Sequence, residues 1–438
     1  MGKKINIKVV LIICLLLFLL TLAILLFVYP GFLRPQYGLS ALPNRRLSSQ
    51  DEVNLAAKIA GDDSRLTTVF RQNFLKDLKV EGKKRENQIV IAGYSLEDHD
   101  TIEQNSDILL SNQLLWGRYL ASKGKLSEFE SWLQLIKEHF ILEDGWALKI
   151  DFQANVLDQS KISWAYDLTY ADILLTAYNR NPSSQILLEI HKTMDRAYPY
   201  FTNSQSMPNL DLKLERIFYP ESSAQSEPSS NPQLLDPYKE AKFIRLSDIN
   251  LFVLESFSLL DSKWQAVFDQ WQALIEHSKE TSSAFYPLGI MPNLQDYVAT
   301  GRQAFLSFSL DNVKLLYTSS SKASDQYYAA CRAFYKQTIL DGSGLFTAYH
   351  INSLEPMTGD MDLPSLALLA DYFMLKQQAA YPEADDLVQR IKTLAEVFRY
   401  RDQLSELDQL FYRKRDDVSP LQFQAEDQIL LMTTGLFD

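Results

Sequence analysis

The sequence predicts an all-α domain preceded by one transmembrane helix, and two observations support this fold class. Apolar residues recur at helical spacing through most of the chain, whereas no series of alternating strands is found. An apolar run near the N-terminus is long enough to cross a bilayer. About 400 residues follow this run, which is too many for a four-helix bundle and enough for one large domain or two of ordinary size.

The apolar run extends from Val9 to Val28, and Thr21 is its only polar residue. At a rise of about 1.5 Å per residue, a helix of this length spans a hydrocarbon core of roughly 30 Å. Three lysines precede the run and favour a cytoplasmic N-terminus. A cleaved signal peptide is the alternative, but its apolar region is usually only about 7–15 residues long. We therefore expect a bacterial single-pass membrane protein with a cytoplasmic tail and uncleaved anchor (1–30), a stalk (31–55) and an extracellular domain (56–438).

Helical periodicity is clearest in two stripes. Phe129, Trp132, Leu133, Ile136 and Phe140 fall at i, i+3, i+4, i+7 and i+11, which is one face of an amphipathic helix. A second stripe runs from Leu387 to Phe398. Further helices are expected at Tyr170–Tyr178, Ser184–Tyr198, Ile249–Leu260, Trp264–Ser278, Asn312–Tyr317, Asp325–Leu340 and Ser365–Gln378. Asn203–Pro237 is rich in Ser, Pro, Asn and Gln, and it is interpreted as a long surface loop.

Composition excludes several classes of function. The net charge is −12 and no run of Lys or Arg forms a stripe, so nucleic acid is not expected as a partner. We interpret the acidity as a source of solubility. Only Cys331 lies outside the apolar run, so no internal disulfide is expected. The five histidines are scattered, and neither a metal site nor a cofactor is expected.

Two aspartates stand at the start of apolar helices, and each has two interpretations. Asp167 and Asp311 lie where a negative side chain is stabilised by the helix dipole, which requires no further function. Aromatic residues gather near both, among them Trp164 and Tyr166 beside Asp167. Aromatic rings beside carboxylates suit sugars, although aromatic residues at such spacings are more often part of a core. The residues alone leave a glycan-binding cleft as one of two alternatives.

Several segments, taken in order, resemble glycoside hydrolase family 8, which includes endo-β-1,4-glucanases, bacterial cellulases, chitosanases and xylanases. Residues 145–151 (GWALKID) resemble the family's G-L-x-A-W-K-I-D stretch, and residues 163–177 resemble its A-S-D-A-D-x-x-I-A-x-x-L-L-x-A signature. Residues 308–314 (FSLDNVK) resemble the Y-x-Y-D-A-x-R segment that carries the catalytic base. The likeness covers roughly residues 66–380 with matching order and spacing.

The resemblance implies an (α/α)6 barrel, a toroid of six helical hairpins, with a glycan groove across one end. It also implies inverting hydrolysis of a β-1,4-linked polysaccharide, in which one carboxylic acid protonates the leaving oxygen and a second carboxylate activates water. By position in the motifs, Asp311 is the expected base and Lys314 replaces the family's Arg. The residues that the resemblance implies to contact the substrate are Asp167, Trp116, Trp164, Tyr166, Lys314 and Trp146.

The sequence departs from the family at the general acid. The family's S-E-G-x-x-Y-G-M motif is matched by residues 111–118 (SNQLLWGR), so Asn112 stands where the acid should be. An amide can hydrogen-bond a sugar oxygen but has no acidic proton to give. Three interpretations follow: a surface glycosidase with a displaced acid, a catalytically impaired accessory that guides a polysaccharide made by synthesis machinery at the same membrane, and an all-α surface protein unrelated to sugars.

Overall fold

The computed structural model describes residues between 65 and 437, with gaps, and all of them belong to one compact unit. The predicted anchor and stalk lie outside the described residues, as does most of the predicted loop Asn203–Pro237. No helix in the described part is long and apolar enough to span a membrane. The described residues are 65–78, 87–97, 101–160, 164–202, 217–219, 239–241, 244–291, 296–298, 306–321, 323–357, 359–375, 384–413 and 420–437.

The described part of the chain is mostly helical, as predicted. Every helix expected from periodicity is found, with its ends shifted by a few residues. Three helices, α3, α4 and α14, have no counterpart among the predicted ones. The α-helices are α3 (Arg65–Phe74), α4 (Leu110–Lys123), α5 (Leu126–His139), α6 (Trp164–Arg180), α7 (Ser184–Phe201), α8 (Leu251–Leu260), α9 (Gln265–Glu276), α10 (Ser309–Tyr317), α11 (Asp325–Leu340), α12 (Leu363–Leu375), α13 (Ala384–Glu396) and α14 (Ala425–Thr434), with 3₁₀ turns η2 (Leu246–Asp248) and η3 (Ser262–Trp264).

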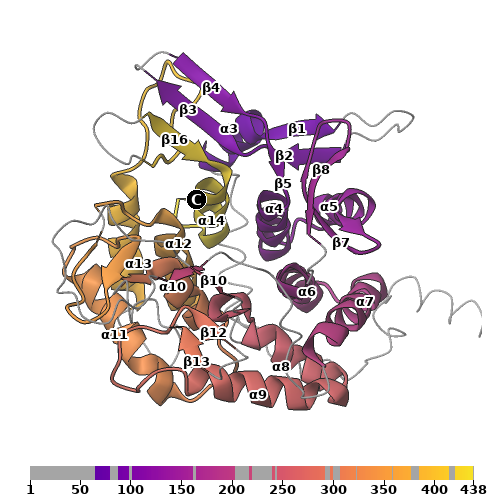
Figure 1. The fold of residues 1–438 in the computed structure, drawn as a ribbon. Coiled ribbons are helices and arrows are strands. Elements are labelled where there is room, and N and C mark those ends of the chain that lie inside the picture. Colours follow the sequence, from indigo (N-terminus) through magenta and orange to yellow (C-terminus); the bar gives the residue numbers. More distant parts are fainter. Residues whose placement is uncertain are drawn as a thin grey trace, which may run out of the picture. The chain divides into compact units, whose positions relative to one another are not determined.

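Six of these helices, which we call the inner helices, contact one another in succession (Figure 1). Helix α4 contacts α6, α6 contacts α8, α10 contacts α12, α12 contacts α14, and α14 returns to α4. The remaining neighbours, α8 and α10, are joined by a hydrogen bond of 3.0 Å from the Phe252 N–H to the Thr318 carbonyl. Each inner helix also packs on an outer helix: α5, α7, α9, α11 and α13 follow their partners in sequence, and α3 packs on α14.

The two sets of helices differ in how their apolar residues are distributed. Outer helix α5 buries the stripe found in the sequence, including Trp132, while its other faces carry charged residues. Inner helices such as α8 and α12 are apolar on most faces because they are covered on both sides. Helices α4 and α5 approach so closely that a Cβ on Gly117 would lie 2.1 Å from the Trp132 ring. The Trp132 indole N–H donates to the Gln113 carbonyl at 2.7 Å, which fixes this contact.

Short antiparallel strands form six small sheets in the described part, and one of them, β2, falls where the sequence suggests a short extended piece at Gln88–Ala92. They are β1 (Leu75–Leu78), β2 (Asn87–Val90), β3 (Gly93–Glu97), β4 (Thr101–Asn105), β5 (Ile108–Leu109), β6 (Ile141–Leu142), β7 (Gly145–Ile150), β8 (Val156–Ser160), β9 (Ile217–Tyr219), β10 (Lys239–Ala241), β11 (Ile244–Arg245), β12 (Gly289–Met291), β13 (Asp296–Val298), β14 (Leu306–Phe308), β15 (Ala348–His350) and β16 (Leu421–Gln424). The layers of the fold therefore consist of helices, and short β-strands occur in the connections between them.

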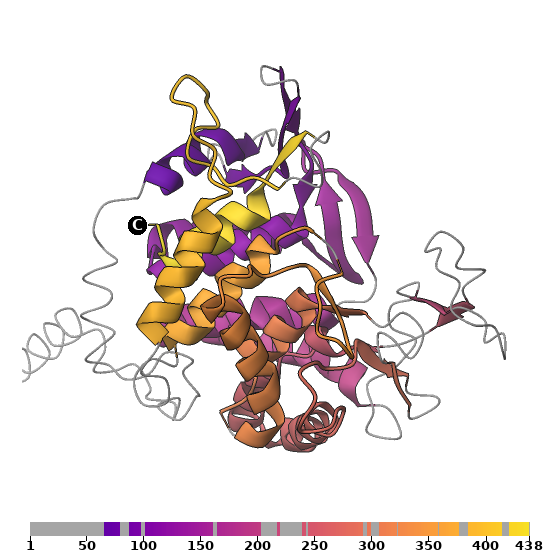
Figure 2. The same cartoon turned by 90° about the vertical axis from the view of Figure 1, so that its left-hand side faces the viewer.

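The strands mark the end of the domain at which the inner helices begin. Strands β5, β14 and β16 directly precede α4, α10 and α14, and each pairs with a strand from a neighbouring connection: β7, β15 and β3 respectively. In Figure 2, β7, β8, β12 and β13 lie on the same, right-hand side of the helices. These pairings hold the loops before successive inner helices against one another.

A buried polar cluster lies between four inner helices. The Arg118 guanidinium of α4 is 4.4 Å from the centre of the Tyr317 ring of α10 and 3.9 Å from a carboxylate oxygen of Asp371 of α12. The Tyr317 hydroxyl donates to the same carboxylate at 2.7 Å. Burial alone would lower the pKa of Arg118, but Tyr317, Asp172 of α6 and Asp371 outweigh it and raise the pKa above its ordinary value. The guanidinium is therefore held charged between α4, α6, α10 and α12.

Replacing Arg118 by Met should destabilise the protein strongly. The substitution leaves the Asp371 and Asp172 carboxylates buried without their cation, and the loss of one partner of a buried ion pair typically costs about 3–5 kcal/mol. Arg390→Met is the matched control, because Arg390 pairs with Asp386 on the exposed face of α13 and such pairs contribute at most about 1 kcal/mol. We expect the thermal unfolding midpoint of the full-length protein to fall by several degrees for Arg118→Met and to change little for Arg390→Met. Equal midpoints for the two variants would contradict the assignment.

Candidate functional site

Asp311 lies in the first turn of α10, at the end of the domain where the inner helices begin. The Ser247 hydroxyl donates to its Oδ1 at 2.5 Å, and Arg245 Nη1 lies 3.7 Å from the same oxygen. Both partners precede α8, so the site joins the connections into two neighbouring inner helices. The side chain of Asp311 is 15% exposed. Its carboxylate is thus oriented by neighbours yet reachable by water, as a general base requires.

Asn312, next to Asp311, holds this turn in place. Its amide oxygen accepts the Tyr286 N–H at 2.8 Å, and its amide nitrogen donates to Ser307 Oγ at 2.7 Å and to the Phe308 carbonyl at 2.8 Å. Asn312 is buried, whereas Phe308 is 42% exposed three residues before Asp311. The predicted substrate residue Lys314 follows on α10 and is half-buried. Sequence reasoning missed Arg245, Ser247 and Asn312. Arg245 and Ser247 contact Asp311, which is far from them in the sequence, and most partners of Asn312 are backbone groups, which no motif records.

Asn112, at the position of the family's acid, lies in the first turn of α4 and is buried. The strand before it, β5, pairs with β7, with Ile108 opposite Ile150. The residue therefore sits at the same end of an inner helix as Asp311. Its amide has donors and an acceptor for hydrogen bonds but no proton of suitable acidity.

Asp167 is fully buried and forms the centre of a structural ion pair. Its Oδ1 accepts from Arg196 Nε of α7 at 2.6 Å and from the Trp146 indole N–H of β7 at 3.1 Å. The Arg196 guanidinium also lies 5.0 Å from the centre of the Trp146 ring. These contacts hold β7 and α7 to the start of α6. Substrate contact by Asp167 and Trp146 stays a prediction, but the observed partners of both residues are protein groups.

The other predicted aromatic residues differ in exposure. Trp116 is buried, stacks on Tyr119 with ring centres 4.9 Å apart, and lies under the guanidinium of Arg71. Trp164 is buried edge-to-face against Phe201. Tyr166 is half-buried, with its ring centre 6.4 Å from that of Trp146. Of the four predicted aromatic residues, Tyr166 alone is partly exposed, so its ring can be reached by a ligand.

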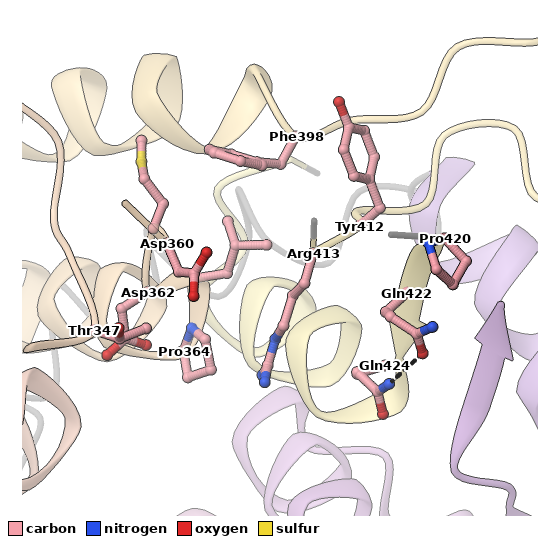
Figure 3. A pocket seen from close by; sticks show the side chains of 12 residues that line it. Thr347, Asp360, Asp362, Pro364, Phe398, Tyr412, Arg413, Pro420, Gln422 and Gln424 are labelled. Carbon is pink, nitrogen blue, oxygen red and sulfur yellow. Dashed lines mark hydrogen bonds between the residues drawn. The ribbon is translucent and has the colours of Figure 1, made fainter. Parts of the chain in front are cut away.

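A pocket of about 580 Å³ lies where α12 and α14 begin and α13 ends, within the size range of small-molecule sites. It connects to the Asp311 turn through the backbone: the Ser309 N–H donates to the Thr347 carbonyl at 3.1 Å, and the Thr347 N–H donates to the Asp360 carbonyl at 3.0 Å. Its lining residues, most of which Figure 3 labels, are Thr347, Asp360, Met361, Asp362, Leu363, Pro364, Phe398, Tyr412, Arg413, Pro420, Gln422 and Gln424.

Two buried carboxyl groups at the pocket have raised pKa values: Asp362 lines the pocket, and Asp427 is paired with the lining residue Arg413. Asp362 caps the N-terminus of α12 by accepting the Ser365 N–H at 3.1 Å and the Ser365 hydroxyl at 2.6 Å. Burial raises the pKa of Asp362 to about 6 despite these bonds. Burial likewise raises the pKa of Asp427 to about 6, against the opposing effect of Arg413. At neutral pH both groups are mostly ionised, and the charge of Asp427 is balanced by Arg413.

The fold is shared with several solved structures of sugar-active proteins at low sequence identity. An alpha-amylase from Clostridium perfringens matches with a TM-score of 0.59 at 12% identity, over 85% of this chain and 97% of that one. A cellobiose 2-epimerase from Bacillus thermoamylovorans matches with 0.55 at 12% identity, over 88% and 100%. A beta-1,3-1,4-glucanase from Paenibacillus sp. X4 matches with 0.53 at 13% identity, over 90% and 93%. No protein-family model and no curated protein sequence matches the chain.

Replacing Asp362 by Asn should change how stability depends on pH. The folded pKa of about 6 lies above the unfolded value of about 3.9, so the stability that the protonated group contributes is full below about pH 4 and is lost as the pH rises through about 6. Asparagine still caps the helix. Between pH 4 and 7, we therefore expect wild type to lose on the order of 2 kcal/mol of stability relative to Asp362→Asn. Thermal unfolding midpoints across this range measure the difference.

Asp151→Asn provides a control of opposite sign. The side-chain hydrogen bond from Asn155 lowers the pKa of Asp151, so its contribution is present above about pH 4 and is lost as the pH falls. Wild type should therefore gain on this variant as the pH rises to about 4, and the difference should then change little up to pH 7. Parallel curves for wild type and Asp362→Asn would show that the carboxyl group at 362 does not titrate in this range.

Proposed function

We propose that the chain is a divergent relative of glycoside hydrolase family 8 that binds a β-1,4-linked polysaccharide at the end of the domain where the inner helices begin. In this proposal the six helical pairs form the (α/α)6 barrel of that family, and the glycan groove crosses the N-terminal ends of the inner helices. The three neighbours named above are an amylase, an epimerase of cellobiose and a glucanase, and all three names refer to glucose-based saccharides.

The observation that carries the proposal is the relation between Asn112 and Asp311. Arg118 and Tyr317 are in contact, with 4.4 Å between the guanidinium and the ring centre. Asn112 lies six residues before Arg118, and Asp311 lies six residues before Tyr317. Six residues of helix rise about 9 Å, so in parallel helices the two residues are at the same height. This supports an arrangement in which the positions of the family's acid and base flank one groove.

The same arrangement supports weak chemistry. Inverting hydrolysis needs an acid on one side of the glycosidic bond and a base on the other, about 6.5–9.5 Å apart. Asp311 can activate water with Ser247 and Arg245 orienting it, whereas Asn112 can only hydrogen-bond the leaving oxygen. A missing general acid typically lowers the rate by about 10²–10⁴. We therefore propose that binding is retained and that hydrolysis, which would invert the anomeric centre, is slow.

A second candidate function is favoured by the buried amide of Asn112. A binding accessory of exopolysaccharide or surface polysaccharide synthesis needs the groove but no acid. The predicted anchor over Val9–Val28 would keep such a protein at the outer face of the bacterial cell membrane, near the synthesis machinery. Location, anchoring and this partner are part of the proposal.

Binding is tested by calorimetric titration of the full-length protein in detergent with cello-, xylo- and chito-oligosaccharides of equal length. We expect heat of binding with at least one series, because the site combines carboxylate, amide and aromatic groups. Maltose oligosaccharides, which are α-linked, serve as the matched control and should bind more weakly. No heat with any β-linked series would remove the glycan proposal.

Activity is tested by supplying the missing acid. Asn112→Glu should raise hydrolysis of the bound polysaccharide by about 10²–10⁴, since the glutamic acid can protonate the leaving oxygen. Asn112→Gln is the control, because glutamine has the size of glutamic acid but no acidic proton, and this variant should stay as slow as wild type. Adding Asp311→Asn to Asn112→Glu should abolish the gain. Fast hydrolysis by wild type that survives Asp311→Asn would show that both assignments are wrong.

A further inference from the structure

A second pocket, which we call the α13 pocket, is lined by the last two turns of α13, by Val397 and Arg399 after it, and by Phe437. Its volume is about 530 Å³, within the size range of small-molecule sites. It shares no lining residue with the pocket beside the Asp311 turn. Phe398 lines that pocket and Arg399 lines this one, and consecutive side chains of an extended segment point to opposite sides. The α13 pocket is therefore separate from the candidate site.

The ring of Phe437 is flanked by two cations. Lys392 Nζ lies 5.5 Å from the ring centre, and the guanidinium carbon of Arg399 lies 5.4 Å from it. The ring of Phe411 packs on Phe437 with 4.7 Å between ring centres, and Arg399 is 5.5 Å from the Phe411 ring as well. Aromatic faces attract cations at such distances. Because Lys392 and Arg399 both line the pocket, their positive charges lie close together in its wall.

The α13 pocket has an excess of positive charge, although the chain as a whole has a net charge of −12. Arg399 Nη1 lies 3.3 Å from a carboxylate oxygen of Glu396, and Arg401 pairs with the same carboxylate. Lys392 forms no ion pair with another described residue. One carboxylate therefore faces three cations. Such a local excess attracts an anion, and the rest of the chain does not supply this attraction.

The other lining groups of the α13 pocket suit a hydroxylated ring. The Thr393 hydroxyl donates to the Gln389 carbonyl at 3.0 Å and can still accept a hydrogen bond, while the Gln389 amide can both donate and accept. Val397, which is 68% exposed, adds apolar surface next to Phe437. An inorganic anion would use the cations alone, and an acyl chain would use the apolar groups alone. A sugar ring that carries a carboxylate uses all three kinds of group.

We propose that the α13 pocket binds an acidic sugar residue, with the sugar carboxylate between Lys392 and Arg399. The sugar ring lies against Val397 and Phe437, and its hydroxyls bond to side chains of α13. The polysaccharide held by this protein then carries carboxylates as well as hydroxyl groups. The choice of a sugar as the anion rests on the proposed glycan binding, whereas the pocket itself lies outside the groove and adds a second point of attachment.

The test compares β-1,4-linked glucose oligomers with oligomers of equal length whose C6 carbons are oxidised to carboxylates. Their affinities for the full-length protein, in a non-ionic detergent without a sugar head group, are measured by calorimetry at neutral pH. We expect wild type to bind the oxidised oligomer at least about tenfold more tightly than the neutral one, which is 1.4 kcal/mol. Non-specific attraction does not produce this preference, because the net charge of −12 repels an anionic ligand.

Substitutions of Lys392 locate the preference in the α13 pocket. Lys392→Met should reduce it to about twofold or less while leaving the affinity for the neutral oligomer unchanged, because Lys392 lies outside the groove. Lys392→Arg keeps the positive charge and should keep the preference. Lys192→Met is the matched control, because it removes an exposed lysine of α7 that does not line the pocket, and it should also keep the full preference.

The outcomes separate this inference from the proposed function. A preference that survives Lys392→Met, or equal wild-type affinities for the oxidised and neutral oligomers, would overturn the inference while glycan binding stands. Inorganic phosphate that displaces the oxidised oligomer at equal concentration would show that the pocket takes any anion, and the assignment of a sugar would then be wrong. Binding of the oxidised oligomer through Lys392, without binding of any neutral series, would support the inference and remove the proposed groove. No binding of either kind of oligomer would remove both.

Discussion

The contact of Arg118 with Tyr317 and Asp371 is the constraint on which the arrangement of the inner helices depends. A guanidinium is well suited to this position because it can face a ring and a carboxylate at once and stays charged when buried. Its three partners come from α10, α12 and α6, so a shift of any one helix would separate a charge from its counter-charge. Apolar packing alone, which has no direction, would not fix the relative height of these helices in the same way.

The loops that precede the inner helices add a second level of order. Paired strands such as β5 with β7 and β14 with β15 fix the backbone on both sides of a helix start. Buried side chains then connect these starts to the next layer, as Asn312 does for Tyr286 and as Asp167 does for Arg196. A side chain at a helix start is thereby held by groups behind it, which is what precise binding requires. The packing of the inner helices fixes the position of the site along their axes, and the loops provide the side chains that surround it.

The sequence was sufficient for the outer helices except α3, and it was insufficient for the inner helices α4 and α14. An outer helix such as α5 faces water on one side, so its apolar stripe is visible in the sequence. Helices α4 and α14 are covered on most sides and contain buried polar residues such as Gln113 and Asp427, so neither stripe nor apolar run marks them. Some of the short strands depend on pairing between distant segments, as β16 does with β3 and β14 does with β15, and no local pattern records such pairing.

The residues of the candidate site likewise fall into those that the sequence predicted and those that it did not. The motif resemblance led to Asp311 and Asn112, because both lie on continuous segments. It could not lead to Ser247 and Arg245, nor to the pocket, whose walls come from segments between residues 347 and 424. Aromatic residues were the weakest guide: Trp116, Trp146 and Trp164 are all buried, because large rings contribute most to stability inside the protein.

Burial also separates the acidic residues into two kinds, although the sequence treats them alike. Asp371, Asp427 and Glu255 are buried, and each accepts hydrogen bonds from a residue on another segment, so their charges serve the fold. Asp311 and Asp360 are partly exposed at the starts of inner helices, where only part of their hydrogen-bonding capacity is used by the protein.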